Sequence, residues 1–176
     1  MQRTWIRSHH RRFAPLYFGT TGLNRFDAPA GQYGTLYLAA DARGAFIETF
    51  GRRLGETRVE LTQVATRLLS QVEQRRPLRL VDLTGPGLSR IGADSRLATG
   101  DYTLSQRWAL ALHEHPEAPD GILYRSRHDP SRLCAAIFER AADALTASSL
   151  GSLADPHNAT LLADILNAYG YSLIVP

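Results

Sequence analysis

Apolar residues occur in short runs along this chain, and most runs end at a glycine, a proline or a charged residue. Residues 34–40 and 133–138 are two such runs. Runs of this length are typical of β-strands, whereas a membrane-spanning helix needs about 20 apolar residues. The sequence therefore predicts short strands with helices between them, and no membrane-spanning segment.

The first predicted helix covers residues 41–54 and carries a carboxylate on its polar face. Asp41 is placed to cap the N-terminus of this helix. Its apolar stripe consists of Phe46, Ile47, Phe50 and Leu54. Glu48 lies about 200° around the helix from Phe46, at ~100° per residue. We therefore expect Glu48 to face a cleft or solvent rather than the core.

Two further helices are predicted from their end signals. Thr103 and Gln106 have the spacing of a capping box for a helix over 103–115. A helix over 156–169 begins with proline, with Asp155 as its expected cap, and is followed by glycine.

The remaining apolar runs predict strands. We expect 68–73 and 78–83 to be two strands joined at residues 75–77, and 146–156 to be a loop. The other expected strands are 4–7, 34–40, 121–125, 133–138 and 173–175. Because no βαβ unit repeats, the expected fold class is α+β (mixed α/β), in one domain spanning residues 1–176.

Two features of the composition exclude several classes of protein. A single cysteine, Cys134, excludes an internal disulfide framework and fits a cytoplasmic protein. All 20 basic residues are arginine, so a P-loop lysine, a lysine nucleophile and a pyridoxal Schiff base are also excluded. The sequence pI of about 9.3 is compatible with a basic nucleic-acid-binding module. The arginines are scattered, however, so we expect no nucleic-acid binding by this chain.

The familiar metal and nucleophile patterns are missing from the sequence. His113 and His115 are two residues apart, which is not the i, i+4 spacing that directs two histidines at one metal ion. Cys134 lies in an apolar run and is expected in the core. No serine has the GxSxG context of a nucleophile elbow. We therefore expect no metal site.

Four polar residues remain as candidates for a functional site: Arg25, Tyr37, Glu48 and Ser126. Each also has a purely structural interpretation, as a surface loop residue, a half-buried strand residue, an exposed helix carboxylate and a turn cap, respectively. All four fall in a loop, in a strand or off the core stripe of a helix. Rigid scaffolds commonly present site groups at such positions.

Several motifs, in order along the chain, resemble the RES domain family. They are Asn24–Pro29, Tyr33–Ala39, Ala45–Phe50, Leu78–Gly85 and Asp120–Arg127. The arginine, glutamate and serine from which the family takes its name match Arg25, Glu48 and Ser126. Tyr37 matches the tyrosine usually found between the first two.

The resemblance implies an ADP-ribosyltransferase-like fold, with two small β-sheet parts forming a cleft flanked by helices. It implies a toxin of an Xre–RES toxin–antitoxin module that degrades NAD by phosphorolysis or hydrolysis. NAD would be the substrate, inorganic phosphate the co-substrate, and no separate cofactor is implied. An Xre-like antitoxin would cover the cleft. ADP-ribosylation of a protein by the same site is the alternative activity.

Roles for individual residues follow from the resemblance and the chemistry of NAD. Cleavage of a glycosidic bond develops positive charge on the ribose, which a carboxylate stabilises; this role is assigned to Glu48. A guanidinium suits the pyrophosphate, and an aromatic face suits the cationic nicotinamide. Arg25 is assigned to the pyrophosphate, with Arg127 as a second candidate, and Tyr37 is assigned to the nicotinamide. Ser126 would donate a hydrogen bond to a phosphate or orient Glu48. Tyr124 is a further expected contact of NAD. Because nicotinamide leaves as a neutral molecule, no strong general acid is required, which fits the absence of a histidine from these motifs.

Overall fold

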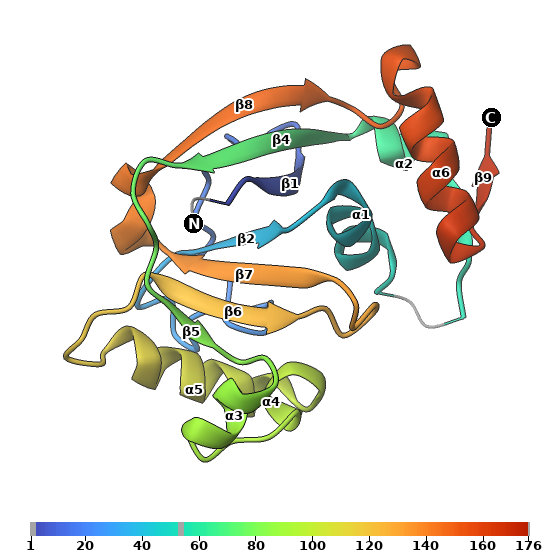
Figure 1. Cartoon of the computed structure of the whole chain (residues 1–176). Coiled ribbons are helices and arrows are strands. Elements are labelled where there is room, and N and C mark those ends of the chain that lie inside the picture. The colour runs from blue at the N-terminus through green and yellow to red at the C-terminus, as the bar shows by residue number, and fades with distance from the viewer. Residues whose placement is uncertain (1–2, 53–54, 176) are drawn as a thin grey trace.

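A seven-stranded, mostly antiparallel sheet runs through the molecule, as the computed structural model shows for residues 3–52 and 55–175 (Figure 1). The strand order is β5–β6–β7–β2–β1–β4–β8, and only β5 and β6 are parallel neighbours. The strands are β1 (Trp5–His10), β2 (Thr35–Ala39), β4 (Arg67–Gln74), β5 (Leu80–Asp82), β6 (Gly121–Arg125), β7 (Leu133–Phe138) and β8 (Leu145–Gly151). A separate parallel pair consists of β3 (Arg58–Glu60) and β9 (Ser172–Ile174).

The large sheet opens between β1 and β2. These two strands share a single register pair, Ile6 with Ala39, whereas β1 pairs with β4 along its whole length. The β8–β4–β1 part therefore diverges from the β2–β7–β6–β5 part, as Figure 1 shows. The expected mixed α+β fold with two sheet parts is confirmed.

Helices gather at the two ends of this arrangement (Figure 1). Helices α3 (Pro86–Arg90), α4 (Arg96–Thr99) and α5 (Tyr102–His113) lie beside β5 and β6. Helices α1 (Ala42–Phe50), α2 (Leu61–Ala65) and α6 (Ala159–Tyr169) lie toward β9. The structure also contains two short 3₁₀ helices, η1 (Glu139–Ala144) and η2 (Pro156–Asn158). In the described residues, no helix is long and apolar enough to cross a membrane.

The local signals for α1 predicted its start correctly. The Asp41 carboxylate accepts a hydrogen bond of 2.7 Å from the Gly44 N–H, as an N-cap residue does. Phe46 and Ile47 are buried, while Glu48 is only partly buried. The helix ends at Phe50, and the expected end at Leu54 lies outside the described residues.

The capping box predicted for the second helix is wrong. The helix begins one residue earlier, because the Asp101 carboxylate accepts a 2.7 Å bond from the Thr103 N–H. The Gln106 amide donates instead to backbone carbonyls of the loop over 22–24. The buried face consists of Ser105 and Ala109, whereas Leu104 is 40% exposed.

The strands predicted over 68–73 and 78–83 are present as β4 and β5, and one predicted loop is wrong. β4 and β5 take distant places in the sheet, because β4 pairs with β1 and β8 whereas β5 pairs with β6. The segment expected to be a loop from residue 146 forms β8 along the exposed edge of β4. Its Ser, Thr and Ala side chains look loop-like in sequence, but backbone pairing with β4 decides its conformation. The end of α6 is as predicted, since Gly170 adopts the left-handed conformation.

The core packs on both faces of the sheet. One cluster contains Phe46, Phe138 and Ile165, and the other contains Trp5 and Val72. Cys134 is fully buried, and burial raises the pKa of its thiol well above the ordinary value. It is therefore the core residue that its apolar sequence context predicts.

Candidate functional site

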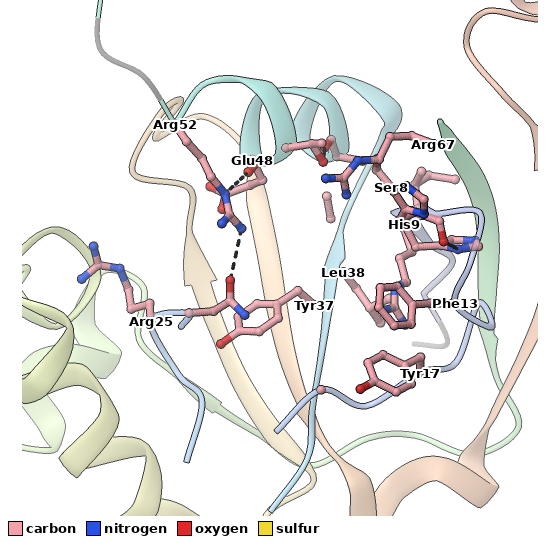
Figure 2. Close-up of a pocket in the computed structure, with 18 of the residues that line it drawn as sticks. Ser8, His9, Phe13, Tyr17, Arg25, Tyr37, Leu38, Glu48, Arg52 and Arg67 are labelled. Carbon is pink, nitrogen blue, oxygen red and sulfur yellow. Dashed lines mark hydrogen bonds between the residues drawn. The ribbon is translucent and has the colours of Figure 1, made fainter. Parts of the chain in front are cut away.

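A cavity of about 570 Å³ occupies the opening between β1 and β2 (Figure 2). Its walls come from β1, β2, α1, the loop between β1 and β2, and the turn between β6 and β7. Six arginines but only one carboxylate, Glu48, are among the described residues that line it. Such a site is suited to an anionic ligand. The arginines are Arg7, Arg12, Arg25, Arg52, Arg67 and Arg127.

Arg25 is held at one end of the cavity by half of its guanidinium group. Its Nη1 donates to the Gly100 carbonyl at 2.8 Å and to the Ser105 hydroxyl at 3.2 Å, and its Cζ lies 4.6 Å from the Tyr102 ring centroid. Its Nη2 is buried and has no hydrogen-bond partner among the described residues. Burial lowers the pKa of Arg25 from its high ordinary value. The unpaired half of the group is therefore available to an anion.

Glu48 projects from α1 into the cavity near Arg52, as Figure 2 shows. Its Oε1 is buried and, in the part of the chain that the structure describes, lacks a hydrogen-bond donor. Arg52 bonds the backbone carbonyl of Glu48 at 3.3 Å and the Asn24 side chain at 3.2 Å, and not the carboxylate. A buried polar atom without a partner is rare in proteins and costs free energy unless a ligand satisfies it.

The hydroxyl of Tyr37 is fixed behind its ring. It donates to Asp27 at 2.9 Å and accepts from the Phe26 N–H at 2.9 Å. Burial and the nearby Asp27 charge raise the pKa of Tyr37 well above its ordinary value. Tyr37 lines the cavity together with Arg25 and Glu48, so the structure brings these three predicted residues together.

Ser126 takes a different position from the other three predicted residues. It is buried and is not among the residues that line the cavity. Its hydroxyl accepts hydrogen bonds from the backbone N–H groups of His128 and Asp129 at 3.1 and 3.2 Å. Ser126 therefore shapes the turn that presents Arg127 and His128 to the cavity.

Two further predicted contacts, Arg127 and Tyr124, do line the cavity. Arg127 is exposed, and the Tyr124 ring packs edge-on against Phe26 at 4.9 Å between centroids. Burial raises the pKa of Tyr124 well above its ordinary value.

A histidine lies at the site although the predicted motifs contain none. His128 lines the cavity close enough to Glu48 for the carboxylate to act on its pKa. Burial nevertheless dominates and lowers the pKa of His128 below 6.5. The signal was present in the sequence, because His128 follows Arg127 directly in the turn that Ser126 shapes. His9 and His10 also line the cavity.

A second group missed from the sequence comes from β1, β4 and the loop after β1. Phe13, Tyr17 and Arg67 line the cavity and appear on its other side from Arg25 in Figure 2. Neither the His9–Arg12 segment nor the start of β4 carried a motif, so only the pairing of β1 with β4 brings them to the site.

The chemistry of the lining residues favours an organic anion over a metal ion. Across residues 3–52 and 55–175, no group of three or more His, Cys, Asp or Glu side chains is arranged to hold a metal ion. The cavity offers a carboxylate, guanidinium groups and aromatic rings instead. These groups are suited to a ligand that carries phosphates, a planar ring and a centre of developing positive charge.

Comparisons with known proteins agree with this geometry. The sequence pattern of the family described as RES domain matches residues 3–157. The protein called "Probable toxin y4kH" from Sinorhizobium fredii (strain NBRC 101917 / NGR234) is 33% identical over 106 residues, covering 60% of this chain and 81% of that protein. A chain in the crystal structure of the M. tuberculosis MbcT–MbcA toxin–antitoxin complex shares the fold. The TM-score is 0.64 at 16% identity, covering 95% of this chain and 90% of that one.

Proposed function

Because the chain belongs to the RES domain family, we propose that it is a toxin-type enzyme that cleaves NAD at the bond between nicotinamide and ribose. The observation that carries this proposal is the pair of buried, unpartnered atoms in one cavity, Arg25 Nη2 and Glu48 Oε1. NAD carries a pyrophosphate for the first atom and a ribose with developing positive charge for the second. The positive charge of Arg25 suits the negatively charged pyrophosphate, and the negative charge of Glu48 suits the ribose as positive charge develops on it.

The proposed reaction is a displacement at the anomeric carbon. The bond from ribose C1 to the nicotinamide nitrogen breaks, and its electron pair returns to the ring, so that nicotinamide leaves uncharged. Glu48 stabilises the oxocarbenium-like ribose while Arg25 holds the pyrophosphate. Tyr37 packs on the nicotinamide ring. An oxygen of inorganic phosphate then bonds C1 to give ADP-ribose 1″-phosphate, or water bonds C1 and loses a proton to give ADP-ribose.

The proposed role as a toxin includes a protein partner. The relative carries "toxin" in its name, and the similar fold comes from a toxin–antitoxin complex. We propose that an Xre-like antitoxin covers the cavity and blocks access to NAD. Adding such a partner should stop nicotinamide release, whereas release that continues in a stable complex would contradict this part of the proposal.

The direct test is to incubate the purified protein with NAD, with and without inorganic phosphate, and to measure nicotinamide and the ribosyl product. Phosphate-dependent release with ADP-ribose 1″-phosphate would establish phosphorolysis. Release without phosphate would establish hydrolysis. ADP-ribose attached to a protein, with little free product, would establish the alternative, protein ADP-ribosylation.

Glu48→Gln provides the decisive variant, because it keeps the size of the side chain and removes its charge. It should lose most turnover while keeping the fold. Glu117→Gln is the matched control, since Glu117 is exposed and lies outside the cavity. Normal NAD cleavage by Glu48→Gln would overturn the proposed mechanism.

A further inference from the structure

The β6–β7 turn (residues 126–132) brings Arg127 and His128 to the cavity, and its own conformation is fixed around Asp129. The Asp129 N–H donates to the Ser126 hydroxyl at 3.2 Å, and the Asp129 carbonyl accepts from the Arg132 N–H at 2.8 Å. Asp129 itself is not among the residues that line the cavity. Its carboxylate instead binds groups that lie behind the site.

This carboxylate ties the turn to the C-terminal helix. Its Oδ2 accepts from the Tyr169 hydroxyl at 2.8 Å and from Arg132 Nε at 3.0 Å. Only 18% of the Asp129 side chain is exposed, and hydrogen bonds to a charged acceptor are roughly twice as strong as neutral ones. Tyr169 is the last residue of α6 and lies beyond residues 3–157, which the RES pattern matches. The family resemblance therefore assigns Tyr169 no role.

Arg132 extends the same network to the helix that carries Glu48. Its Nη1 donates to Asp41 Oδ2 at 2.8 Å, while Asp41 Oδ1 accepts the capping bond from the Gly44 N–H. The turn is therefore fastened to the start of α1 through Arg132 and to the end of α6 through Tyr169.

His128 is a side chain on this turn whose position affects its charge. It is partly buried in the cavity, and burial holds its pKa below 6.5. Glu48 favours the imidazolium ion, whereas the guanidinium groups of Arg25, Arg52 and Arg127 disfavour it. Because burial is the largest of these effects, movement of the turn toward solvent would let the imidazole take up a proton at higher pH.

We propose that Tyr169 is a positioning residue of the site, which holds the β6–β7 turn through Asp129 and thereby keeps His128 in place beside Glu48. The inference rests on the proposed function for its effect on NAD cleavage. Its effect on the turn rests on the hydrogen bonds alone. Tyr169 contacts no substrate in this proposal, so loss of its hydroxyl should be detected at His128.

The first test is the pH dependence of kcat/KM for NAD in Tyr169→Phe, which removes one hydroxyl and keeps the ring. Protonated His128 competes for the Glu48 carboxylate, so the fall of kcat/KM in acid should move to higher pH in the variant. At about pH 8 the imidazole is neutral in both proteins, and their kcat/KM values should be nearly equal. An equal loss at every pH would indicate only a structural role and would overturn the proposal, as would an unchanged profile.

Two further variants locate the effect. Tyr171→Phe is the matched control, because the Tyr171 hydroxyl makes a 3.4 Å bond to the Phe50 carbonyl, and it should keep the wild-type profile. Asp129→Asn removes the charge that Tyr169 binds and should move the profile in the same direction as Tyr169→Phe. A shift in folded Tyr169→Phe without one in folded Asp129→Asn would contradict the route through Asp129. Circular dichroism and thermal unfolding show whether each variant is folded.

Titration of the His128 imidazole by NMR gives a result that does not depend on turnover. The pKa of His128 should be higher in Tyr169→Phe than in the wild-type protein and unchanged in Tyr171→Phe. If the wild-type protein does not cleave NAD, the proposed function fails, and this titration alone decides whether Tyr169 positions the turn. An equal pKa of His128 in the wild-type protein and in Tyr169→Phe would reject the positioning role.

Discussion

The Tyr37 hydroxyl donates a hydrogen bond of 2.9 Å to the carboxylate of Asp27, which is 1% exposed. The other oxygen of Asp27 accepts from Thr21 and from both the backbone and the side chain of Asn24. One buried carboxylate therefore ties the strand residue Tyr37 to the loop that carries Arg25. Asp27 therefore helps to hold both Tyr37, which we propose packs on nicotinamide, and Arg25, which we propose binds the pyrophosphate.

Tyr37→Phe should destabilise the protein by about 1–3 kcal/mol, because it leaves a buried acceptor and the Phe26 N–H without their partner. Urea unfolding measures the change. Tyr171→Phe is the control and should cost less, since the Tyr171 hydroxyl makes only a 3.4 Å bond. Tyr37→Ala should lose more NAD turnover than Tyr37→Phe, because it also removes the ring. Equal turnover by the two variants would argue against a role for the ring.

Arg25→Ala should raise KM for NAD and also lower the melting temperature. The first effect follows from loss of the proposed phosphate contact, and the second from loss of the bonds to Gly100 and Ser105. Arg25→Lys should show nearly the same rise in KM and the same fall in melting temperature. A lysine ammonium cannot contact both sets of partners as a planar guanidinium can. Arg107→Ala is the control for surface charge. An unchanged KM in folded Arg25→Ala would remove this residue from the site.

The local parts of the fold could be predicted from the sequence, and the non-local parts could not. Asp41 caps α1 through a contact three residues away, so its pattern is visible in one short window. The position of β8 depends instead on pairing with β4, more than seventy residues earlier in the chain. The polar composition of β8 does not predict that pairing.

The same distinction applies to the site. Arg25, Tyr37 and Glu48 were predicted because their motifs resemble a known family, and they meet at one cavity. Arg67 has no motif and reaches the cavity only because β4 pairs with β1. His128 directly follows the last predicted motif, but only the folded turn shows that it lines the cavity.

Phe46→Ala should cost about 3–5 kcal/mol, because Phe46 is fully buried and its removal leaves a cavity. Trp108→Ala should cost less than Phe46→Ala, since the structure places Trp108 partly buried at the edge of the core rather than inside it. Leu104→Ala, on the exposed side of α5, should change the free energy of unfolding by no more than about 0.5 kcal/mol. Chemical denaturation of the three variants checks this order. A larger loss for Trp108→Ala than for Phe46→Ala would contradict it.

Asp129 should make the stability fall in acid. Burial alone would raise its pKa, but hydrogen bonds from Ser131, Tyr169 and Arg132 outweigh burial and hold the pKa of Asp129 at about 2, below the ordinary 3.8. A carboxylate with a lowered folded pKa stabilises the protein fully above its unfolded pKa, and that contribution is lost as the pH falls through the folded pKa. The difference in free energy of unfolding between wild type and Asp129→Asn should therefore shrink between about pH 4 and pH 2. A difference that stays constant over this range would show that the charge of Asp129 contributes nothing.

His128 should set the acid limit of catalysis. Burial lowers the pKa of His128 below 6.5, so the imidazole is neutral at pH 7 and leaves the charge of Glu48 free to act on the ribose. As the pH falls through that lowered pKa, His128 becomes a cation beside Glu48 and competes with the developing charge on the ribose for the carboxylate. We therefore expect kcat/KM for NAD to fall with decreasing pH below 6.5.

His128→Gln tests this role of His128 directly, because glutamine stays uncharged throughout the range. The variant should hold its own kcat/KM level to lower pH than the wild-type protein does. His115→Gln, at an exposed position outside the cavity, should keep the wild-type profile. If His128→Gln retains the same fall in kcat/KM at low pH as the wild-type protein, the charge of His128 plays no part in the reaction.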